Sequence, residues 1–158
     1  MKFIINASPI IFLAKIELIQ YLPELFEDII IPDGVFNEVL AHDDEASRWI
    51  KNHGKQYISV LDQIPVNIHA WDLGRGETEV IASALNLKNC AVGLDDQAAR
   101  NCALSYRLKI IGTIGLILRA QKIEVIKDGE PYLNKLIKSG YRISECVLQH
   151  ALFLMRKR

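Results

Sequence analysis

Short, nearly continuous apolar runs alternate along this chain with longer segments whose apolar residues recur at helical spacing. The apolar runs predict strands over residues 2–6, 28–31, 57–61, 90–94 and 109–112. A strand that is apolar along its whole length is buried on both faces, which is typical of a parallel sheet covered by helices. The pattern therefore predicts the α/β class, as a three-layer α/β/α sandwich with a central parallel sheet.

The helical spacing predicts helices over residues 8–20, 33–40, 45–53, 77–87, 96–106, 113–121, 131–138 and 144–155. Ser8 before Pro9, and Pro32 before Asp33, are favourable residues for a helix start. The segment at about 144–155 is amphipathic, and it packs against its own domain, a second subunit or another protein. With 158 residues and no linker or repeat, the chain is expected to form a single domain over residues 1–158.

The charges are balanced overall, with 19 basic and 19 acidic residues, which excludes a globally basic nucleic-acid binder. They are nevertheless unevenly placed. Residues 17–45 contain nine acids and no Lys or Arg, whereas residues 98–127 contain six bases and one acid. A further five bases lie between residues 138 and 158. This asymmetry indicates either an anionic partner on one side or simply a solvated helix face.

The three cysteines lack metal-ligand or redox spacing, and they are expected to be reduced thiols. No uninterrupted apolar stretch is long enough to span a membrane, and the N-terminus does not have the pattern of a signal peptide. We therefore expect a cytoplasmic protein without a membrane partner.

Polar residues follow the predicted strands at the points where each strand ends. In a sheet of parallel strands the carboxyl ends meet at one edge, where ligands bind. The candidates there, with the acids of two neighbouring helices, are Asn6, Asp95, Asp96, Thr113, Glu38, Glu77 and Glu79. Three or four such oxygens together would suit Mg²⁺ or Mn²⁺.

Each acid also has a purely structural explanation. Glu77 and Glu79 lie in a first helical turn, where the helix dipole favours acids. Asp96 is placed to cap the helix that follows it. Glu38 has apolar neighbours in the sequence, and a carboxylate near the edge of a core needs a partner.

The order of five motifs resembles that of the PIN-domain family, in particular small prokaryotic PIN-like proteins related to VapC-type toxins. The motifs are "INASPIIFLAKI", "LFEDIIIPDGVFNEVL", "LGRGETEVIASAL", "VGLDDQAAR" and "IIGTIGLILRA". The resemblance implies an α/β/α nuclease fold. It places the first family acid at Asn6, the second at Glu38, the third at Glu77 or its neighbour Glu79, and the fourth at Asp95 or Asp96. Ser8 and Thr113 match positions where the family often has hydroxyls near the metal.

The resemblance implies a metal-dependent ribonuclease, the toxin of a toxin–antitoxin pair, that cuts RNA with Mg²⁺ or Mn²⁺. On this interpretation Glu38, Glu77 and Asp95 are metal ligands, and Arg100 faces the phosphate that is cleaved. A homodimer and a cognate antitoxin are the expected protein partners. Asn6 departs from the family because its amide removes one negative charge, so we expect weaker metal binding. The alternative is a PIN-like module that has lost catalysis and binds RNA or a protein.

Three other kinds of site have weak support. The four histidines are scattered without zinc spacing, and no serine lies in a nucleophile elbow. The segments "LGRGETE" and "GTIG" lack the glycines and the lysine of nucleotide-binding loops.

Overall fold

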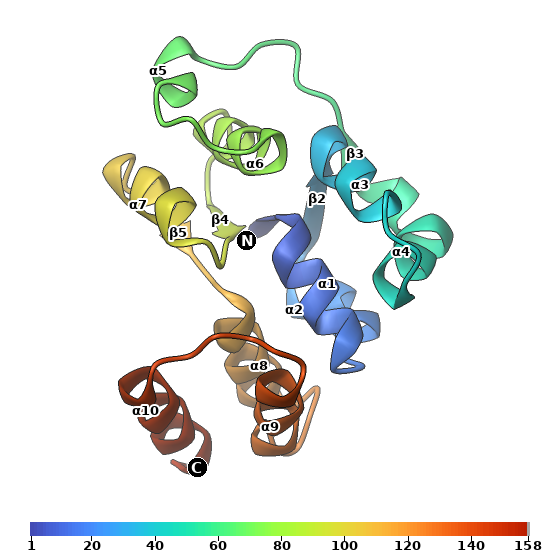
Figure 1. Cartoon of the computed structure of the whole chain (residues 1–158), viewed down its shortest axis with the longest axis vertical. Helices are drawn as coiled ribbons and strands as arrows, with labels where there is room; N and C mark the ends of the chain where they lie inside the picture. Colours follow the sequence, from blue (N-terminus) through green and yellow to red (C-terminus); the bar gives the residue numbers. More distant parts are fainter. Residues whose placement is uncertain (158) are drawn as a thin grey trace.

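Five parallel strands form one sheet at the centre of the molecule (Figure 1). The computed structural model describes residues 1–157. The strand order is β3-β2-β1-β4-β5, and Ile4 in the central strand pairs with Ile30 on one side and Val92 on the other. The strands are β1 (Lys2–Ile5), β2 (Asp28–Pro32), β3 (Ile58–Ser59), β4 (Cys90–Gly93) and β5 (Lys109–Ile110).

Helices cover both faces of this sheet (Figure 1). Helices α6 and α7 pack beside β4 and β5, whereas α8 contacts both α1 and α2 on the opposite side. The predicted three-layer α/β/α fold is therefore confirmed. The helices are α1 (Ala7–Lys15), α2 (Leu22–Leu25), α3 (Asp33–Leu40), α4 (Glu45–Trp49), α5 (Val66–His69), α6 (Arg75–Leu85), α7 (Gln97–Ser105), α8 (Thr113–Lys122), α9 (Glu130–Lys138) and α10 (Glu145–Arg156).

The central strand is fully buried because helices lie on both of its faces. Phe3, Ile4 and Ile5 have no exposed surface, and the ring of Phe3 stacks on Phe26 with 4.1 Å between centroids. Gly93 on the neighbouring strand leaves room for that ring, since a Cβ there would lie 2.7 Å from Phe3 Cζ. The continuous apolar runs in the sequence therefore correctly predicted a sheet with helices on both faces.

The strand order places a topological switch between β1 and β4. From β1 the chain continues to β2 and β3, whereas from β4 it continues in the other direction to β5. The connections after β1 and β4 therefore diverge and leave a crevice at the carboxyl ends of these two strands, which is where open α/β sheets bind ligands. Asn6 follows β1 and Asp95 follows β4, so both lie at this crevice.

Several helix ends differ from the prediction. The first helix begins at Ala7, with Asn6 rather than Ser8 as its N-cap, and it ends at Lys15 shortly before Glu17 adopts a left-handed φ of 60°. The helix predicted over residues 45–53 continues beyond Trp49 as a π-helical turn. The sequence did not predict α2 and α5, which have four residues each and show too little periodicity.

The C-terminal helices pack on α8 (Figure 1). Gln121 joins them, because its amide donates to the carbonyl of Met155 at 2.7 Å and accepts from the N–H of Gly129 at 2.7 Å. Helix α10 begins after Ser144, whose Oγ accepts a hydrogen bond from the N–H of Val147. Within residues 1–157, none of the helices has the length and apolar character needed to cross a membrane.

Candidate active site

Asn6 is buried at the end of β1 without a partner for its side-chain oxygen. Only 5% of the residue is exposed, and Oδ1 accepts no hydrogen bond from any of residues 1–157. The backbone N–H of Asn6 donates to the carbonyl of Gly93 at 3.0 Å, which fixes the residue between β1 and β4. A buried acceptor that stays unpaired costs about 1–3 kcal/mol. The position of this oxygen therefore indicates a place for a ligand.

Glu38 lies beside Asn6, and the first turn of α6 faces both residues. A Cβ on Gly76 would lie 3.0 Å from Glu38 Oε2 and 3.1 Å from Asn6 Oδ1. Both oxygens therefore face the space left by the missing side chain of this glycine. Any other residue at position 76 would crowd the two oxygens.

Glu77 lies next to Gly76 in the first turn of α6 and adds a second carboxylate to that of Glu38. Its Oε2 accepts a hydrogen bond from the N–H of Gly74 at 3.3 Å. Burial raises the pKa of Glu77, and the negative charges of Asp96 and Glu38 raise it further, while the hydrogen bond opposes the shift. Two other carboxylates thus repel the carboxylate of Glu77, and a bound cation would relieve that repulsion.

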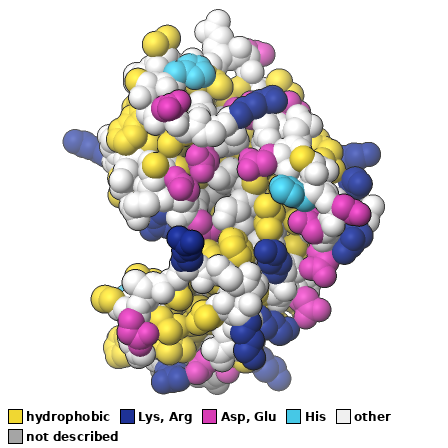
Figure 2. Space-filling view, in the orientation of Figure 1, with side chains coloured by type: hydrophobic (Ala, Val, Ile, Leu, Met, Phe, Trp, Pro, Cys, Tyr) yellow, Lys and Arg dark blue, Asp and Glu magenta, His cyan; other side chains and the backbone are white. Residues whose placement is uncertain are grey.

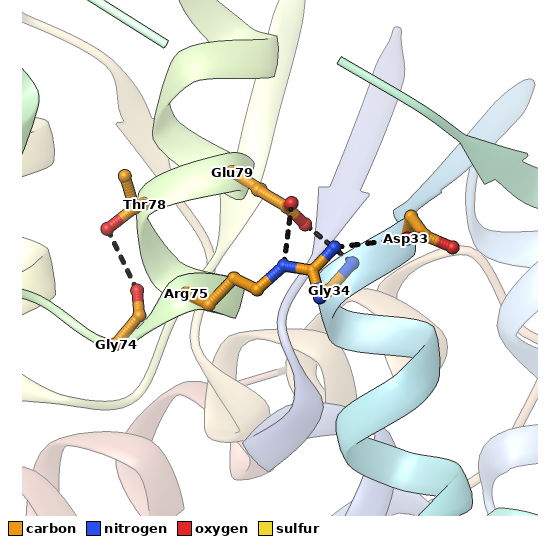
Figure 3. Close-up of polar contacts among 6 residues, drawn as sticks. All are labelled: Asp33, Gly34, Gly74, Arg75, Thr78 and Glu79. Atoms are coloured by element: carbon orange, nitrogen blue, oxygen red, sulfur yellow. Dashed lines mark hydrogen bonds and ion pairs between the residues drawn. The ribbon is translucent and has the colours of Figure 1, made fainter. Parts of the chain in front are cut away.

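Glu79, the alternative to Glu77, faces a different environment (Figure 3). Its Oε2 accepts from the N–H of Gly34 at 2.6 Å, and its Oε1 accepts from Arg75 Nε at 3.2 Å. Arg75 also bonds Asp33 through Nη2, at 3.1 Å. Glu79 therefore holds the start of α6 against the start of α3, and this places Glu77 and Glu38 on the two sides of one groove.

Asp95 lies at the same edge of the sheet, and four hydrogen bonds hold its carboxylate. Oδ1 accepts from the N–H of Thr113 at 2.8 Å and from the hydroxyl of Tyr141 at 2.8 Å. Oδ2 accepts from Thr113 Oγ1 at 2.6 Å and from Ser8 Oγ at 3.1 Å. Because each carboxylate oxygen has two lone-pair sites, these donors occupy all four. Metal ligation by Asp95 stays a prediction, and it requires displacement of one of these donors.

Asp96 is the N-cap of α7, as its position in the sequence predicted. Its Oδ2 accepts from the N–H of Ala99 at 3.0 Å. Oδ1 accepts no hydrogen bond from a residue that the structure describes. Asp96 is exposed and close enough to Glu77 to raise its pKa, so it borders the groove without being buried in it.

Arg100 lies behind Asp95. Its Nη1 donates to the carbonyl of Leu94 at 3.1 Å, and a Cβ on Gly112 would meet both Arg100 Nη1 and Asp95 Oδ1 at 3.0 Å. The guanidinium is therefore close to the Asp95 carboxylate, and it faces the side of β5 and α8.

The structure therefore brings Asn6, Glu38 and Glu77 to one groove, with Asp96 at its border. Figure 2 shows acidic side chains on both sides of the groove that separates α6 and α7 from α3. Ser8 and Thr113 both donate hydrogen bonds to Asp95, at the same edge of the sheet. Among residues 1–157, no three His, Cys, Asp or Glu side chains form a ready-made metal cluster. The donor set that fits a hard cation instead combines carboxylates with the unpaired amide oxygen of Asn6.

Tyr141 is the residue near the site that the sequence did not predict. It belongs to the segment between α9 and α10, and its ring stands edge-on to Phe12 with 5.0 Å between centroids. Burial raises its pKa well above the usual range, and the negative charge of Asp95 adds to the effect. Tyr141 therefore stays protonated and donates to Asp95 across the physiological pH range.

Comparison with protein-family models identifies the family of this chain. No curated protein matches the chain significantly. A protein-family model described as a PIN domain matches residues 2–157, which is nearly the whole chain. The chain therefore belongs to the PIN-domain family.

Proposed function

We propose that this protein is a metal-dependent ribonuclease that hydrolyses phosphodiester bonds of RNA. The observation that carries the proposal is the buried, unpaired Oδ1 of Asn6, which lies beside Glu38 in a space that only glycine at position 76 leaves open. The nuclease-type fold of the family and the general dependence of PIN domains on divalent metal ions support it.

Asn6, Glu38 and Glu77 are the residues that would hold Mg²⁺ or Mn²⁺. When bound, a divalent ion lowers the pKa of a water molecule and offsets the charge of the phosphodiester. Asn6 contributes an oxygen without charge, so the site binds the ion more weakly than three carboxylates would. Asp96, with Oδ1 not bonded to any described residue, would orient a water molecule at the border of the groove. Asp95 positions Ser8, Thr113 and Tyr141 through its four hydrogen bonds.

Cleavage of single-stranded RNA in Mn²⁺ tests this assignment. Glu38→Gln and Glu77→Gln should each lower the cleavage rate by on the order of 10²-fold or more, as expected for a lost metal ligand or proton-transfer group. Glu24→Gln changes an exposed glutamate on α2 that forms no hydrogen bond with Glu38 or Glu77; it is the matched control and should leave the rate unchanged. Equal rates in all four proteins would overturn the proposed site.

Metal binding has its own measurement. A ligand that binds only the folded state raises the melting temperature. Mn²⁺ should therefore raise the melting temperature of the native protein and of Glu24→Gln, but much less that of Glu38→Gln. No metal-dependent rise in the native protein would contradict a metal centre at this groove.

The second candidate function is a PIN-like module that binds RNA or a protein without cleaving it. The neutral amide of Asn6, where the family has an acid, favours this alternative. It predicts RNA binding together with no cleavage and no effect of Mn²⁺ on the melting temperature.

The protein partners are a separate part of the proposal. Resemblance to PIN toxins suggests a cytoplasmic toxin that forms a homodimer and binds a small antitoxin. Exposed apolar side chains on α10, with Phe153 at 60% and Leu154 at 40%, support a protein contact at the C-terminal helix. Light scattering of the purified chain, alone and after co-expression with the product of the adjacent gene, measures both associations.

A further inference from the structure

A pocket of about 630 Å³ opens beside Asp95, on the side of α8 and α10. Its walls come from β5, the start of α7, one side of α8 and the segment from Tyr141 to Val147. Figure 2 shows the molecule hollowed in this region, between α7 and α10. The volume lies within the range of roughly 300–1,000 Å³ that small-molecule sites occupy. The pocket shares Asp95 and Tyr141 with the edge of the candidate active site.

Four cationic side chains line this pocket against a single acid. The cations are Arg100, Arg119, Lys122 and Arg142, and the acid is Asp95. Arg100 donates to the backbone carbonyl of Leu94 and forms no ion pair with a described residue. The guanidinium of Arg119 instead lies against Leu25 and Phe26, outside this pocket, so its charge adds little here. Lys122 and Arg142 are exposed and form no ion pair with any residue from 1 to 157. The Asp95 carboxylate is already occupied by four donors. The pocket therefore has a net positive charge that suits an anion.

The remaining walls of the pocket are apolar. Ile111, Ile114 and Leu118 line it from β5 and α8, and Ile143 and Val147 line it from the segment that leads into α10. A polyanion without flat apolar groups would contact only the cationic side chains of the pocket. A nucleotide uses both features, because its base packs on apolar or aromatic side chains and its phosphates pair with Arg and Lys.

We propose that this pocket seats one nucleotide of a single-stranded RNA. The base lies between Ile114 and Val147, and the flanking phosphates lie on Arg100, Lys122 and Arg142. The strand is single, because a base within a duplex is stacked and cannot enter a pocket. The proposal rests on the proposed function in taking RNA as the substrate, and it places the bound strand beside the groove that holds Asn6 and Glu38.

Binding measured without cleavage tests the pocket separately from catalysis. The probe is a short, fluorescently labelled single-stranded RNA of mixed sequence, followed by fluorescence anisotropy in EDTA. Arg142→Glu and Lys122→Glu should each weaken binding by roughly tenfold and reduce the slope of log affinity against log salt by about 0.7. Lys88→Glu makes the same charge change just before the opposite end of β4, and it should leave both quantities nearly unchanged.

A substitution that fills the pocket without changing its charge tests the seated base. Val147→Trp should weaken binding by roughly tenfold, the size of one lost base contact. Leu104→Trp on α7, which replaces an exposed apolar residue outside the pocket, should have no effect. A single strand of the same length with abasic sites, and a duplex, should both bind more weakly than the intact single strand.

The outcomes separate this proposal from the proposed function. Loss of RNA affinity in Arg142→Glu and Val147→Trp, with both controls unaffected, supports the pocket whether or not the protein cleaves RNA. Equal affinity in all variants overturns it even if Glu38 proves essential for cleavage. A Glu-rich peptide that competes as strongly as RNA of equal charge would also overturn it, because the pocket would then recognise an acidic protein segment.

Discussion

At the scale of single residues, two oxygen atoms and one glycine define the candidate cation site. Asn6 Oδ1 is buried and unpaired, Glu38 Oε2 lies beside it, and Gly76 leaves the space that both oxygens face. The raised pKa of Glu77 reflects burial and two neighbouring negative charges. Unfavourable features of this kind are typical of functional sites, because a ligand compensates them.

Asn6→Asp should tighten metal binding, because it adds a negative charge beside Glu38 at the proposed metal site. In a calorimetric titration with Mn²⁺ the variant should bind more tightly than the native protein. In EDTA the same variant should be less stable by about 1–3 kcal/mol in urea unfolding, because a buried carboxylate then lies beside Glu38 without a cation. Unchanged affinity for Mn²⁺ would show that residue 6 does not reach the metal.

Glu77→Gln should change the pH dependence of stability in the metal-free protein. The pKa of Glu77 is higher in the folded than in the unfolded chain, so its ionisation disfavours folding. The substitution should therefore stabilise the protein at pH 7, in EDTA, and the gain should vanish as the pH falls below the usual glutamate pKa of about 4.3. Urea unfolding of variant and native protein at several pH values measures the difference. A gain that persists unchanged at low pH would mean that another effect of the substitution is responsible.

At the scale of elements, α6 and α3 carry the two sides of the groove, and Glu79 fixes one against the other. The sequence placed both glutamates of "GETE" in a first helical turn but left open which one faces the site. The structure distinguishes them because residues two apart point about 200° apart around a helix. Glu79 bonds Gly34 and Arg75, whereas Glu77 faces Glu38 and Asp96.

The same substitution at these two positions should therefore have opposite effects. Glu79→Gln should lower the free energy of unfolding by about 1–3 kcal/mol, because a buried acceptor of a backbone N–H and of Arg75 loses its charge. Glu77→Gln should leave the metal-free fold intact and lower RNA cleavage instead. Urea unfolding and cleavage assays on both variants provide the comparison. A stability loss at Glu77 as large as that at Glu79 would contradict the division.

The elements themselves were predictable to different degrees. The bounds of strands β1, β2 and β4 were predicted to within one residue. A strand that is buried on both faces is apolar along its length, so the end of the apolar run marks the end of the strand. Helix starts were less certain. Ser8 before Pro9 is a favourable start, yet Ser8 donates to Asp95 instead of capping the helix, so a tertiary contact prevailed over the local signal.

At the scale of the whole molecule, the C-terminal helices are joined to the end of β4 through one side chain. Tyr141 and Asp95 are 46 positions apart in the sequence, and the hydroxyl of Tyr141 lies 2.8 Å from Asp95 Oδ1. The carboxyl-end rule predicted that Asn6 and the Asp95–Asp96 pair meet, because it follows from strand order alone. No comparable rule brings Tyr141 there. Its segment lies outside the sheet, and Gly140 before it indicates only a turn.

Tyr141→Phe should loosen the attachment of α10 to the rest of the molecule while leaving the sheet intact. The change removes one hydrogen bond to a charged group, so the free energy of unfolding should fall by about 1–2 kcal/mol, and Asp95 Oδ1 keeps only the N–H of Thr113. Hydrogen exchange should accelerate at the amides of α10 more than at those of β1, because partial opening of the C-terminal helices no longer breaks that bond. Tyr132→Phe on α9 is the matched control, since the Tyr132 hydroxyl bonds to no residue in the described part of the chain. Equal exchange rates in the two variants would mean that the packing of α10 on α8 alone holds the C-terminal region in place, and that the proposed RNA pocket keeps its shape without Tyr141.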